Sequence, residues 1–499
     1  MMKQKEERRK IVSPANRKKG LHLGRIQEKA LKGMRIVAII LCIAAVGAVG
    51  FRVVQKNEKT LFSPKNKQKT EESVDAKKGQ EETKTFQALN DVKDAKAQIT
   101  SYDSYGTSLN LEGDITLPGA DKITGLSLAI RNAYEDPEKQ KEPEYTQKLK
   151  YEVDGTEVTF RLSDKITNGF CLEELKTGDY CALLQVEYGE NGTEYHSFTN
   201  TSGEKDLEYY TLTRNQSNNK INLSFLKEQT MTYLSLKSVP SELPDDVYDI
   251  VIDAGHGGND SGAVNGSYTE ADIVLDIALA LRDSLEKEGF KVFLTRDGSE
   301  DPNEKTVYTM YDKNGRVNVT GRSKAKYSLS LHLNSNVDRV NITGVQVYAS
   351  IRGDNRLAKC FADNIVNIAQ TTYSGMKTYR IEDGVYNRAY TEADIADAAS
   401  KAQSAGYEPY NITTDTDYFY MVRETGGMAT NAYVDGRNTS YGKNEFMDSN
   451  QGIQSFLLEL GYISEDVDLQ NLLTNQGKYV QAITDTLVEE NAKYPNLNQ

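Results

Sequence analysis

The sequence predicts an α/β domain with a mostly parallel sheet and helices on both faces, preceded by an all-β sandwich module and an N-terminal transmembrane helix. Three patterns support this prediction. Strand-like and helix-like segments alternate in residues 247–496, short strand-like segments separated by turn residues fill residues 99–238, and residues 36–54 are almost wholly apolar. A chain of 499 residues has room for two or three domains.

The amino-terminal segment has the charge pattern of a membrane anchor. Residues 1–35 hold twelve Lys or Arg against three Glu, a net charge of +9, whereas the whole chain carries −13 and the remainder therefore −22. A basic block before an apolar run stays in the cytoplasm. We therefore expect a cytoplasmic tail in residues 1–35, a single-pass anchor in the cell membrane at residues 36–54, and an extracellular remainder. The alternative is a cleaved signal peptide, because Ala45-Val46-Gly47 offers small residues.

Two segments of different character follow the apolar run. Residues 55–98 are rich in Lys, Glu, Gln, Thr and Ser and hold few apolar residues, so we expect a disordered linker. Residues 99–238 contain alternating segments at regular spacing, which is typical of an Ig-like sandwich. The pattern is equally compatible with a carbohydrate-binding or wall-binding module and with a spacer. The acidic charge of the exported part excludes nucleic acid as a natural partner.

The elements of the α/β domain are predicted from the spacing of apolar residues, which switches between the spacing of a strand and that of a helix. Strands are expected at residues 248–253, 291–294, 327–335, 344–349, 418–422 and 455–460, and helices at residues 273–288, 316–326, 355–372 and 479–493. Alternation of strands and helices favours parallel pairing. Ligands of open α/β sheets bind beside the carboxyl ends of the strands, so residues that follow strands are candidates for a site.

Two of the four histidines stand at the ends of expected strands. His256 lies on the turn Ala254-Gly255-His256-Gly257-Gly258, and His332 lies near the end of an apolar segment. Imidazole is a common metal ligand, and small neighbours leave room for an ion and its water. The chain has no Cys-x-x-Cys pair, so a zinc site would need nitrogen and oxygen ligands.

Two glutamates are candidates for the same edge of the sheet. Glu270 opens the helix that follows the His256 turn, and it could be a metal ligand or only a helix-stabilising acid, with Asp260 or Asp272 as the rival ligand. Glu459 interrupts an apolar strand. Burial of an unpaired carboxylate costs roughly several kcal/mol, so Glu459 needs a cation, a proton or a crevice.

Six short motifs occur in a fixed order along residues 249–494. They are Ile-Asp-Ala-Gly-His256-Gly-Gly, Thr-Glu270-Ala-Asp-Ile-Val-Leu, Leu-Thr-Arg296-Asp, Gly-Arg322-Ser, Ser-Leu-His332-Leu-Asn-Ser and Leu-Leu-Glu459-Leu-Gly-Tyr-Ile-Ser. The ordered set resembles the zinc-dependent N-acetylmuramoyl-L-alanine amidases of the third amidase type. Each motif alone would be a weak signal, but their common order is specific.

This resemblance implies a zinc ion (Zn2+) held by His256, Glu270 and His332, with Glu459 as the catalytic carboxylate. It implies peptidoglycan as the substrate and the amide bond between N-acetylmuramic acid and L-alanine as the bond that is cut. Arg296 and Arg322 match family positions that look structural, although a buried arginine such as Arg322 could instead pair with Glu459.

The chain departs from the simplest family pattern in its loops. Residues 298–315 form a longer polar segment, and residues 374–417 and 424–450 are long segments before the strand of Glu459. Loops of this length are usually functional or disordered. We expect residues 374–450 to form a substrate groove or a lid, and a lid would require an activator protein. Two alternative functions remain, namely another zinc-dependent cell-wall peptidase and a catalytically inactive wall-binding scaffold.

Overall fold

The structure is a computed structural model, and it describes most of the chain after residue 83. The described residues are 84–139, 142–162, 169–203, 205–215, 218–299, 315–336, 341–406, 412–425 and 451–493. The predicted cytoplasmic tail, the predicted anchor and residues 55–83 of the predicted linker lie outside this set. Among the described residues, no helix combines the length and the apolar character that crossing a membrane requires.

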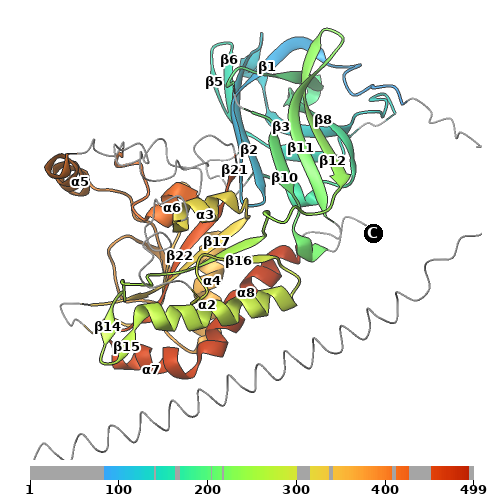
Figure 1. The fold of residues 1–499 in the computed structure, drawn as a ribbon. Coiled ribbons are helices and arrows are strands. Elements are labelled where there is room, and N and C mark those ends of the chain that lie inside the picture. Colours follow the sequence, from blue (N-terminus) through green and yellow to red (C-terminus); the bar gives the residue numbers. More distant parts are fainter. Residues whose placement is uncertain are drawn as a thin grey trace, which may run out of the picture. The chain divides into compact units, whose positions relative to one another are not determined.

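The first described domain, called the β-module below, is built from strands alone apart from short 3-10 turns (Figure 1). Its strands are β1 (Lys93–Tyr105), β2 (Ser108–Thr116), β3 (Gly125–Asn132), β4 (Tyr145–Lys148), β5 (Lys150–Asp154), β6 (Glu157–Arg161), β7 (Phe170–Cys171), β8 (Gly178–Glu187), β9 (Thr193–Asn200), β10 (Leu207–Tyr210), β11 (Asn219–Glu228) and β12 (Met231–Pro240). They join, with β21 (Gln451–Gly452), into one hydrogen-bonded sheet of thirteen strands. The all-β prediction is confirmed, but the hydrogen bonds link the strands into one sheet rather than two separate ones.

The β-module begins earlier than the sequence predicts. Strand β1 starts at Lys93, and Ala88 and Leu89 before it are buried against Cys181 and Leu183 of β8. The predicted linker therefore does not extend to residue 98. The polar composition of residues 84–98 concealed the strand because β1 buries only alternate residues in this part.

The second described domain contains a mixed sheet of seven strands in the order β16-β13-β17-β22-β18-β20-β19. Its strands are β13 (Ile250–Ala254), β16 (Val292–Leu294), β17 (Tyr327–Asn334), β18 (Gln346–Tyr348), β19 (Arg380–Glu382), β20 (Val385–Tyr386) and β22 (Gln454–Tyr462), beside a separate hairpin of β14 (Val264–Asn265) and β15 (Tyr268–Thr269). The four strands β16, β13, β17 and β22 are parallel, whereas β18 runs antiparallel to β22. The α/β prediction is confirmed.

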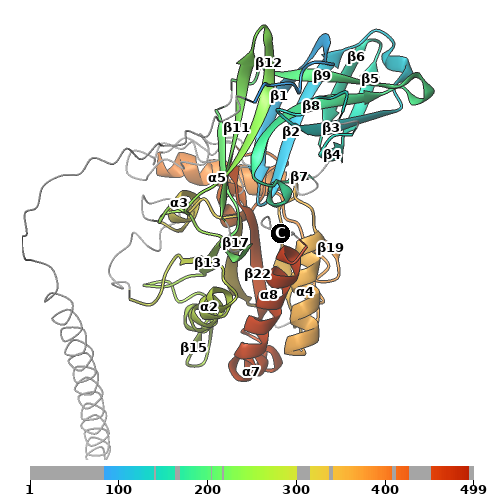
Figure 2. The same cartoon turned by 90° about the vertical axis from the view of Figure 1, so that its right-hand side faces the viewer.

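Helices cover both faces of this sheet, as the two views show (Figures 1 and 2). The helices are α2 (Glu270–Lys287), α3 (Arg316–Arg322), α4 (Arg356–Ala369), α5 (Glu392–Ala405), α6 (Tyr420–Thr425), α7 (Asp466–Thr474) and α8 (Gln476–Asn491). Helices α2, α4 and α8 pack on the apolar face, where the side chains of Leu329, Leu331 and Leu333 join one core. The burial of each such side chain contributes about 1.5–3 kcal/mol.

The opposite face of the central strands carries polar side chains beside two smaller apolar clusters, because successive side chains of a strand point to opposite sides. On β17 this face carries Ser330 and His332, and on β22 it carries Ser455 and Glu459. Helix α6 covers part of it, and the Thr425 and Ser455 hydroxyl oxygens are 2.6 Å apart. The alternation therefore places the candidate catalytic residues on the face that the large apolar core does not use.

Several elements differ from the sequence prediction. Residues 418–422, predicted as a strand, include the start of helix α6, in which Met421 and Val422 are buried. A short apolar run does not distinguish a strand from a buried helix. Helix α7 was not predicted. In the long segment before β22, the described part forms β19, β20 and α5, whereas residues 426–450 lie outside the described set, so the lid remains a prediction.

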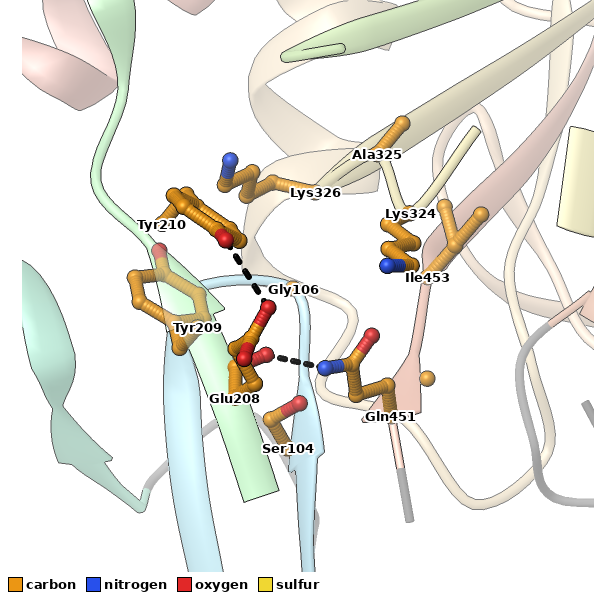
Figure 3. A pocket seen from close by; sticks show the side chains of 11 residues that line it. Ser104, Gly106, Glu208, Tyr209, Tyr210, Lys324, Ala325, Lys326, Gln451 and Ile453 are labelled. Atoms are coloured by element: carbon orange, nitrogen blue, oxygen red, sulfur yellow. Dashed lines mark hydrogen bonds between the residues drawn. The ribbon is translucent and has the colours of Figure 1, made fainter. Parts of the chain in front are cut away.

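The β-module and the α/β domain belong to one compact unit, residues 83–499. Their contact surface surrounds a small cavity that Tyr209, Lys326 and Gln451 help to line (Figure 3). On the β-module side, Glu173 is fully buried and accepts hydrogen bonds from the Tyr209 hydroxyl at 2.5 Å and from the Leu212 N–H at 3.2 Å.

Glu173 predicts a pH dependence of stability. Burial raises the pKa of its carboxyl from 4.5 to about 7, although the hydrogen bond from Tyr209 and the charge of Lys326 oppose this change. The pKa of Glu173 is higher in the folded protein than in the unfolded chain, so the protonated carboxyl favours the folded state. This contribution to the free energy of unfolding is complete below pH 4.5 and is lost as the pH rises to about 7. The loss from this group is about 3 kcal/mol. We expect Glu173→Gln to reduce the difference in the free energy of unfolding between about pH 5 and about pH 8, measured by chemical denaturation. An unchanged difference would contradict this assignment.

Candidate metal centre

Three side chains from different elements converge at the carboxyl end of the central strands. His256 follows β13 on a tight turn with a φ of 60°, Glu270 is the first residue of α2, and His332 lies on β17. The β14–β15 hairpin reverses the chain between the first two residues. The Thr269 hydroxyl accepts a hydrogen bond from the Asp272 N–H at 3.2 Å, which caps α2 and fixes where Glu270 begins the helix.

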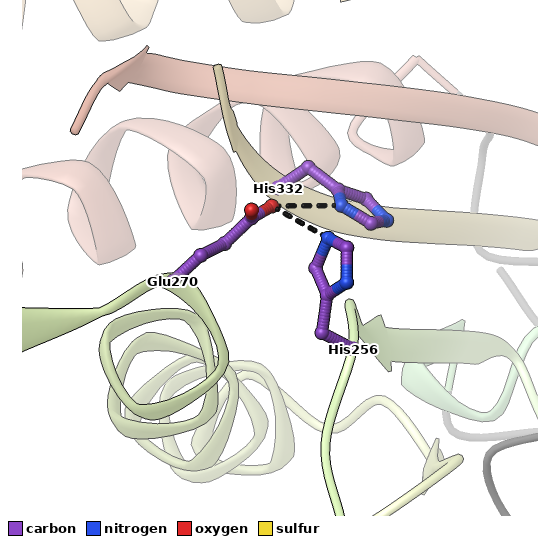
Figure 4. Close-up of side chains that lie close together, drawn as sticks. All are labelled: His256, Glu270 and His332. Atoms are coloured by element: carbon purple, nitrogen blue, oxygen red, sulfur yellow. Dashed lines mark hydrogen bonds and ion pairs between the residues drawn. The ribbon is translucent and has the colours of Figure 1, made fainter. Parts of the chain in front are cut away.

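The three side chains meet at one carboxylate oxygen (Figure 4). Glu270 Oε1 lies 2.9 Å from His332 Nδ1 and 3.1 Å from His256 Nε2. The two imidazole rings are 4.9 Å apart at an interplanar angle of 81°. One donor atom from each residue lies within 4.8 Å of the other two, which is the separation that a shared metal ion requires. The structure thus brings together all three ligands that the sequence predicts.

The charges within this cluster depend on one another. Burial alone would raise the pKa of Glu270, but hydrogen bonds from His256 and His332 outweigh burial and hold this pKa well below its ordinary value. Burial lowers the pKa of His332. Burial would also lower the pKa of His256, yet Glu270 and Asp260 raise it. The cluster therefore holds an ionised carboxylate beside two imidazoles, and this is a donor set that suits a divalent cation.

Two glycines leave the space in which this cluster fits. A Cβ atom at Gly255 would lie 2.4 Å from His332 Cε1, and one at Gly262 would lie 2.6 Å from Glu270 Oε2. Gly262 also has a φ of +62°, which L side chains rarely adopt. A larger residue at either position would displace a candidate ligand.

Asp260 contacts the cluster from outside. Its Oδ2 lies 2.8 Å from His256 Nδ1, while Nε2 of the same ring faces Glu270. Asp260 therefore orients His256 rather than joining the three ligands, and Asp272 is exposed on the first turn of α2. Of the alternatives that the sequence left open, the geometry favours Glu270.

We expect Asp260→Ala to weaken metal binding about 10-fold to 100-fold, because a carboxylate bonded to a ligating histidine fixes its tautomer and orientation. Equilibrium titration of the metal-free protein with zinc would measure this affinity. Asp272→Ala, which removes an exposed carboxylate two residues from Glu270, should leave the affinity unchanged. Equal affinities for the two variants would show that Asp260 does not orient the ligand.

Glu459 lies beside the cluster on the neighbouring strand. It is opposite His332 in the parallel pair β17–β22 and opposite Gln346 in the antiparallel pair β18–β22. Part of its side chain reaches the surface, but Oε2 is buried and has no hydrogen-bond partner among the described residues. Burial and the charge of Glu270 raise its pKa to about 8, while His256 lowers it. A buried carboxylate oxygen without a partner is costly, and a proton, a cation or a bound polar group would offset this cost.

A buried network lies behind the metal loop, which is the turn of residues 254–258 that carries His256. The sequence did not predict this network. Asp253, at 0% exposure, accepts two hydrogen bonds from Arg316, Nε at 2.7 Å and Nη2 at 2.6 Å, and one each from Ser330 and Thr295. Burial alone would raise the pKa of Asp253, but Arg316 holds it well below its ordinary range. A lone Asp in an apolar strand was the available signal, because such a carboxylate must have a partner.

We expect Arg316→Met to lower the free energy of unfolding by about 3–5 kcal/mol, because it leaves the Asp253 carboxylate buried without its countercharge. Arg282→Met is the matched control, since Arg282 and Asp283 form a partly exposed pair with Nη2 and Oδ1 at 2.7 Å. The control should change stability by less than about 1 kcal/mol. Chemical denaturation of both variants tests this, and similar small losses would refute the importance of the buried pair.

The side chain of Arg296 holds the turn that carries His256 by hydrogen bonds to backbone carbonyls. Its Nε donates to the Ala254 carbonyl at 2.9 Å, and its Nη2 donates to the carbonyls of Gly255 at 2.9 Å and Ala271 at 2.7 Å. One buried guanidinium thus joins the residue before His256 to the residue after Glu270. This agrees with the structural role that the resemblance implies for Arg296.

The fold and the geometry define an α/β protein with a His-Glu-His cluster at the carboxyl ends of its parallel strands, and the donor atoms of this cluster are close enough to share a metal ion. Residues 250–489 match the family model described as N-acetylmuramoyl-L-alanine amidase. The chain belongs to this amidase family, which confirms the resemblance found in the sequence.

Two curated relatives come from Bacillus subtilis (strain 168). The germination-specific N-acetylmuramoyl-L-alanine amidase is 31% identical over 140 residues, which cover 26% of this chain and 59% of that protein. The uncharacterized protein YqiI is 30% identical over 166 residues, which cover 32% of this chain and 76% of that protein. The chain therefore spans less than two thirds of the first of these relatives.

The solved structures that match this chain cover about half of it. They include the amidase AmiC2 of Nostoc punctiforme, which is 22% identical. The match covers 49% of this chain and 97% of that chain, with a TM-score of 0.31. They also include the CwlD amidase of Clostridioides difficile in complex with the GerS lipoprotein, which is 21% identical. The match covers 49% of this chain and 99% of that chain, with a TM-score of 0.32.

Proposed function

We propose that this protein hydrolyses the amide bond between N-acetylmuramic acid and L-alanine in peptidoglycan, with a zinc ion held by His256, Glu270 and His332. The observation that carries the proposal is the convergence of these three side chains, with Glu459 beside them, in a chain of the amidase family. Three protein ligands are the number that a catalytic zinc site uses.

The cation, when bound, supplies a Lewis acid that polarises the scissile carbonyl and makes hydroxide available at neutral pH. The residues of the chain supply orientation and proton transfer. Glu270 Oε1 also accepts a hydrogen bond from the Leu333 N–H at 2.9 Å, and its Oε2 accepts one from the Ala263 N–H at 3.0 Å. These bonds hold the carboxylate in one orientation between the two imidazoles.

Glu459 is the residue that moves the proton. It accepts the proton of the attacking water and delivers it to the nitrogen of the leaving L-alanine, so that a carboxyl group and a free amine are formed. Burial and the charge of Glu270 raise the pKa of Glu459, so the carboxyl holds the proton, once it has taken it from the water, until the leaving amine accepts it. Glu459 is only partly buried, so the exposed part of its side chain can meet the water.

Product analysis on purified peptidoglycan tests the proposal. The full-length protein should release chains with new L-alanine amino termini and leave muramic acid intact, a chelator should stop the reaction, and added zinc should restore it. A cell-wall peptidase would instead create amino termini inside the stem peptide. No product at all, with zinc bound, would favour an inactive wall-binding scaffold.

We further propose that the protein is anchored in the cell membrane by residues 36–54, with residues 1–35 in the cytoplasm and the amidase domain outside. The charge difference across the apolar run supports this orientation. External protease treatment of intact protoplasts should digest the amidase domain, and fractionation should place the full-length chain with the membranes. A soluble chain that begins after residue 47 would instead support a cleaved signal peptide.

A further inference from the structure

The β-module contacts the amino ends of the strands that lead to the metal centre. Asp249 precedes β13 and Lys326 precedes β17, while β21 and Ile453 precede β22. Each of these positions touches the β-module or lines the cavity at the contact surface. The three strands β13, β17 and β22 are neighbours in the sheet, and they lead to His256, His332 and Glu459.

Backbone pairing joins the β-module to the strand of Glu459. Ser104 and Tyr105 of β1 pair in parallel with Gln451 and Gly452 of β21. The N–H of Gly106 donates to the Gly452 carbonyl at 3.0 Å. Figure 3 shows the Gln451 side-chain amide, which donates to the backbone carbonyl of Glu208. The chain therefore enters β22 as part of the sheet of the β-module.

Hydrogen bonds to buried groups join the β-module to the strand before His256. Asp249, at 0% exposure, accepts a hydrogen bond from the Thr213 N–H at 3.2 Å and another from the Thr213 hydroxyl. The Thr213 hydroxyl also lies 2.8 Å from the Gly289 carbonyl oxygen. Arg214 Nη1 donates to the Val488 carbonyl at 2.9 Å, which extends the contact to α8.

A buried lysine joins the β-module to the strand of His332. Lys326 is 2% exposed, and its Nζ lies 3.9 Å from Asp249 Oδ1 and 5.3 Å from the centre of the Tyr209 ring. Burial lowers the pKa of Lys326, and the carboxyls of Asp249 and of Glu173 in the β-module oppose this change. A charged group that is buried without a partner costs free energy. The groups that surround Lys326 come from both domains, so the two contacting surfaces are complementary at this position.

These contacts lie far from the reacting centre. His332 lies six positions after Lys326, which corresponds to about 20 Å in an extended strand. The contact surface of the β-module therefore does not touch the metal ligands. Its influence on them must pass through the three strands.

We propose that the β-module is an intramolecular brace of the catalytic sheet, and that its docking to the amino ends of β13, β17 and β22 holds these strands in the register that the metal centre requires. A mobile wall-binding domain would be joined by a flexible linker and would share few contacts with its neighbour. Here a β-ladder and a buried charge cluster join the two domains. The proposal concerns stability and geometry, so it is independent of which bond the enzyme cuts.

A matched pair of glycine variants in the full-length protein tests the brace. Gly106 has a φ of +61°, and a Cβ atom there would lie 3.0 Å from Gln454 Cβ and 3.4 Å from the Lys326 carbonyl oxygen. Gly155, on the turn between β5 and β6, has a φ of +65° and nothing within 4 Å of such an atom. Gly106→Val adds backbone strain and separates the domains, whereas Gly155→Val adds the strain alone.

Hydrogen–deuterium exchange in β17 and β22 is the measurement. We expect exchange at least about tenfold faster in Gly106→Val than in Gly155→Val, together with weaker zinc binding. Exchange rates and zinc affinities that are equal in the two variants would overturn the brace.

A milder pair keeps the test valid if Gly106→Val fails to fold. Thr213→Val removes the hydroxyl that bonds to Asp249 and Gly289, and Thr201→Val removes a hydroxyl that bonds within the β-module, to the Ile99 carbonyl at 3.1 Å. We expect faster exchange at the start of β13 only in Thr213→Val. Equal exchange rates at the start of β13 in both variants would refute the proposal, whether or not the protein cleaves peptidoglycan.

Discussion

Glu459→Gln should reduce turnover on purified peptidoglycan by about 10²-fold to 10⁴-fold, which is the usual effect of removing a general acid–base group. Glutamine has nearly the same shape, but it can neither accept the proton of the attacking water nor deliver one to the leaving amine. Because Glu459 is not among the three candidate ligands, the variant should retain its zinc. The measurements are the rate of appearance of L-alanine amino termini and the metal content of the purified variant.

Glu286→Gln is the control for this variant, because Glu286 is exposed on α2. It makes the same chemical change outside the metal centre and should leave turnover at the wild-type level. Full activity of Glu459→Gln would exclude the proton-transfer role. Loss of zinc together with activity would instead place Glu459 among the groups that hold the metal.

The double variant His256→Ala, His332→Ala should lose zinc almost completely, and with it all amidase activity. Two of the three candidate ligands disappear, and Glu270 alone offers only a carboxylate for the ion. Elemental analysis of the purified protein gives the metal content directly, while circular dichroism reports whether the fold persists.

His196→Ala serves as the control for removal of a histidine. His196 belongs to the β-module, where its Nδ1 lies 2.9 Å from the Ala95 carbonyl oxygen. This variant should keep one zinc per chain. A normal metal content in the double variant would show that the metal centre lies elsewhere.

Local patterns in the sequence indicated candidate residues for the site, and the family resemblance of the ordered motifs assigned their roles. His256 and His332 each stand at the end of a strand, and parallel strands bring such residues to one edge of a sheet. Glu459 was recognisable as a carboxylate in an apolar strand. The helix cap at Thr269 likewise fixes Glu270 from neighbouring residues. These features are local, so they can be read without knowledge of the fold.

Other features depend on residues that are remote in the sequence. Arg316 pairs with Asp253 across 63 positions, and nothing near either residue identifies its partner. The run at residues 418–422 became the start of helix α6 rather than a strand, and in that helix it packs against β22. Tertiary packing overrides the weak local preference of such short apolar runs.

By itself, the sequence determined the class of each domain and the order of the site motifs, because periodicity and strand ends are properties of neighbouring residues. The roles of His256, Glu270, His332 and Glu459 followed from the family resemblance of those motifs. Only the tertiary structure decided that Asp260 orients His256, that Arg316 neutralises Asp253, and that β1 pairs with β21. Each of these contacts needs two segments at a distance of a few ångströms, and the packing of the whole chain sets that distance.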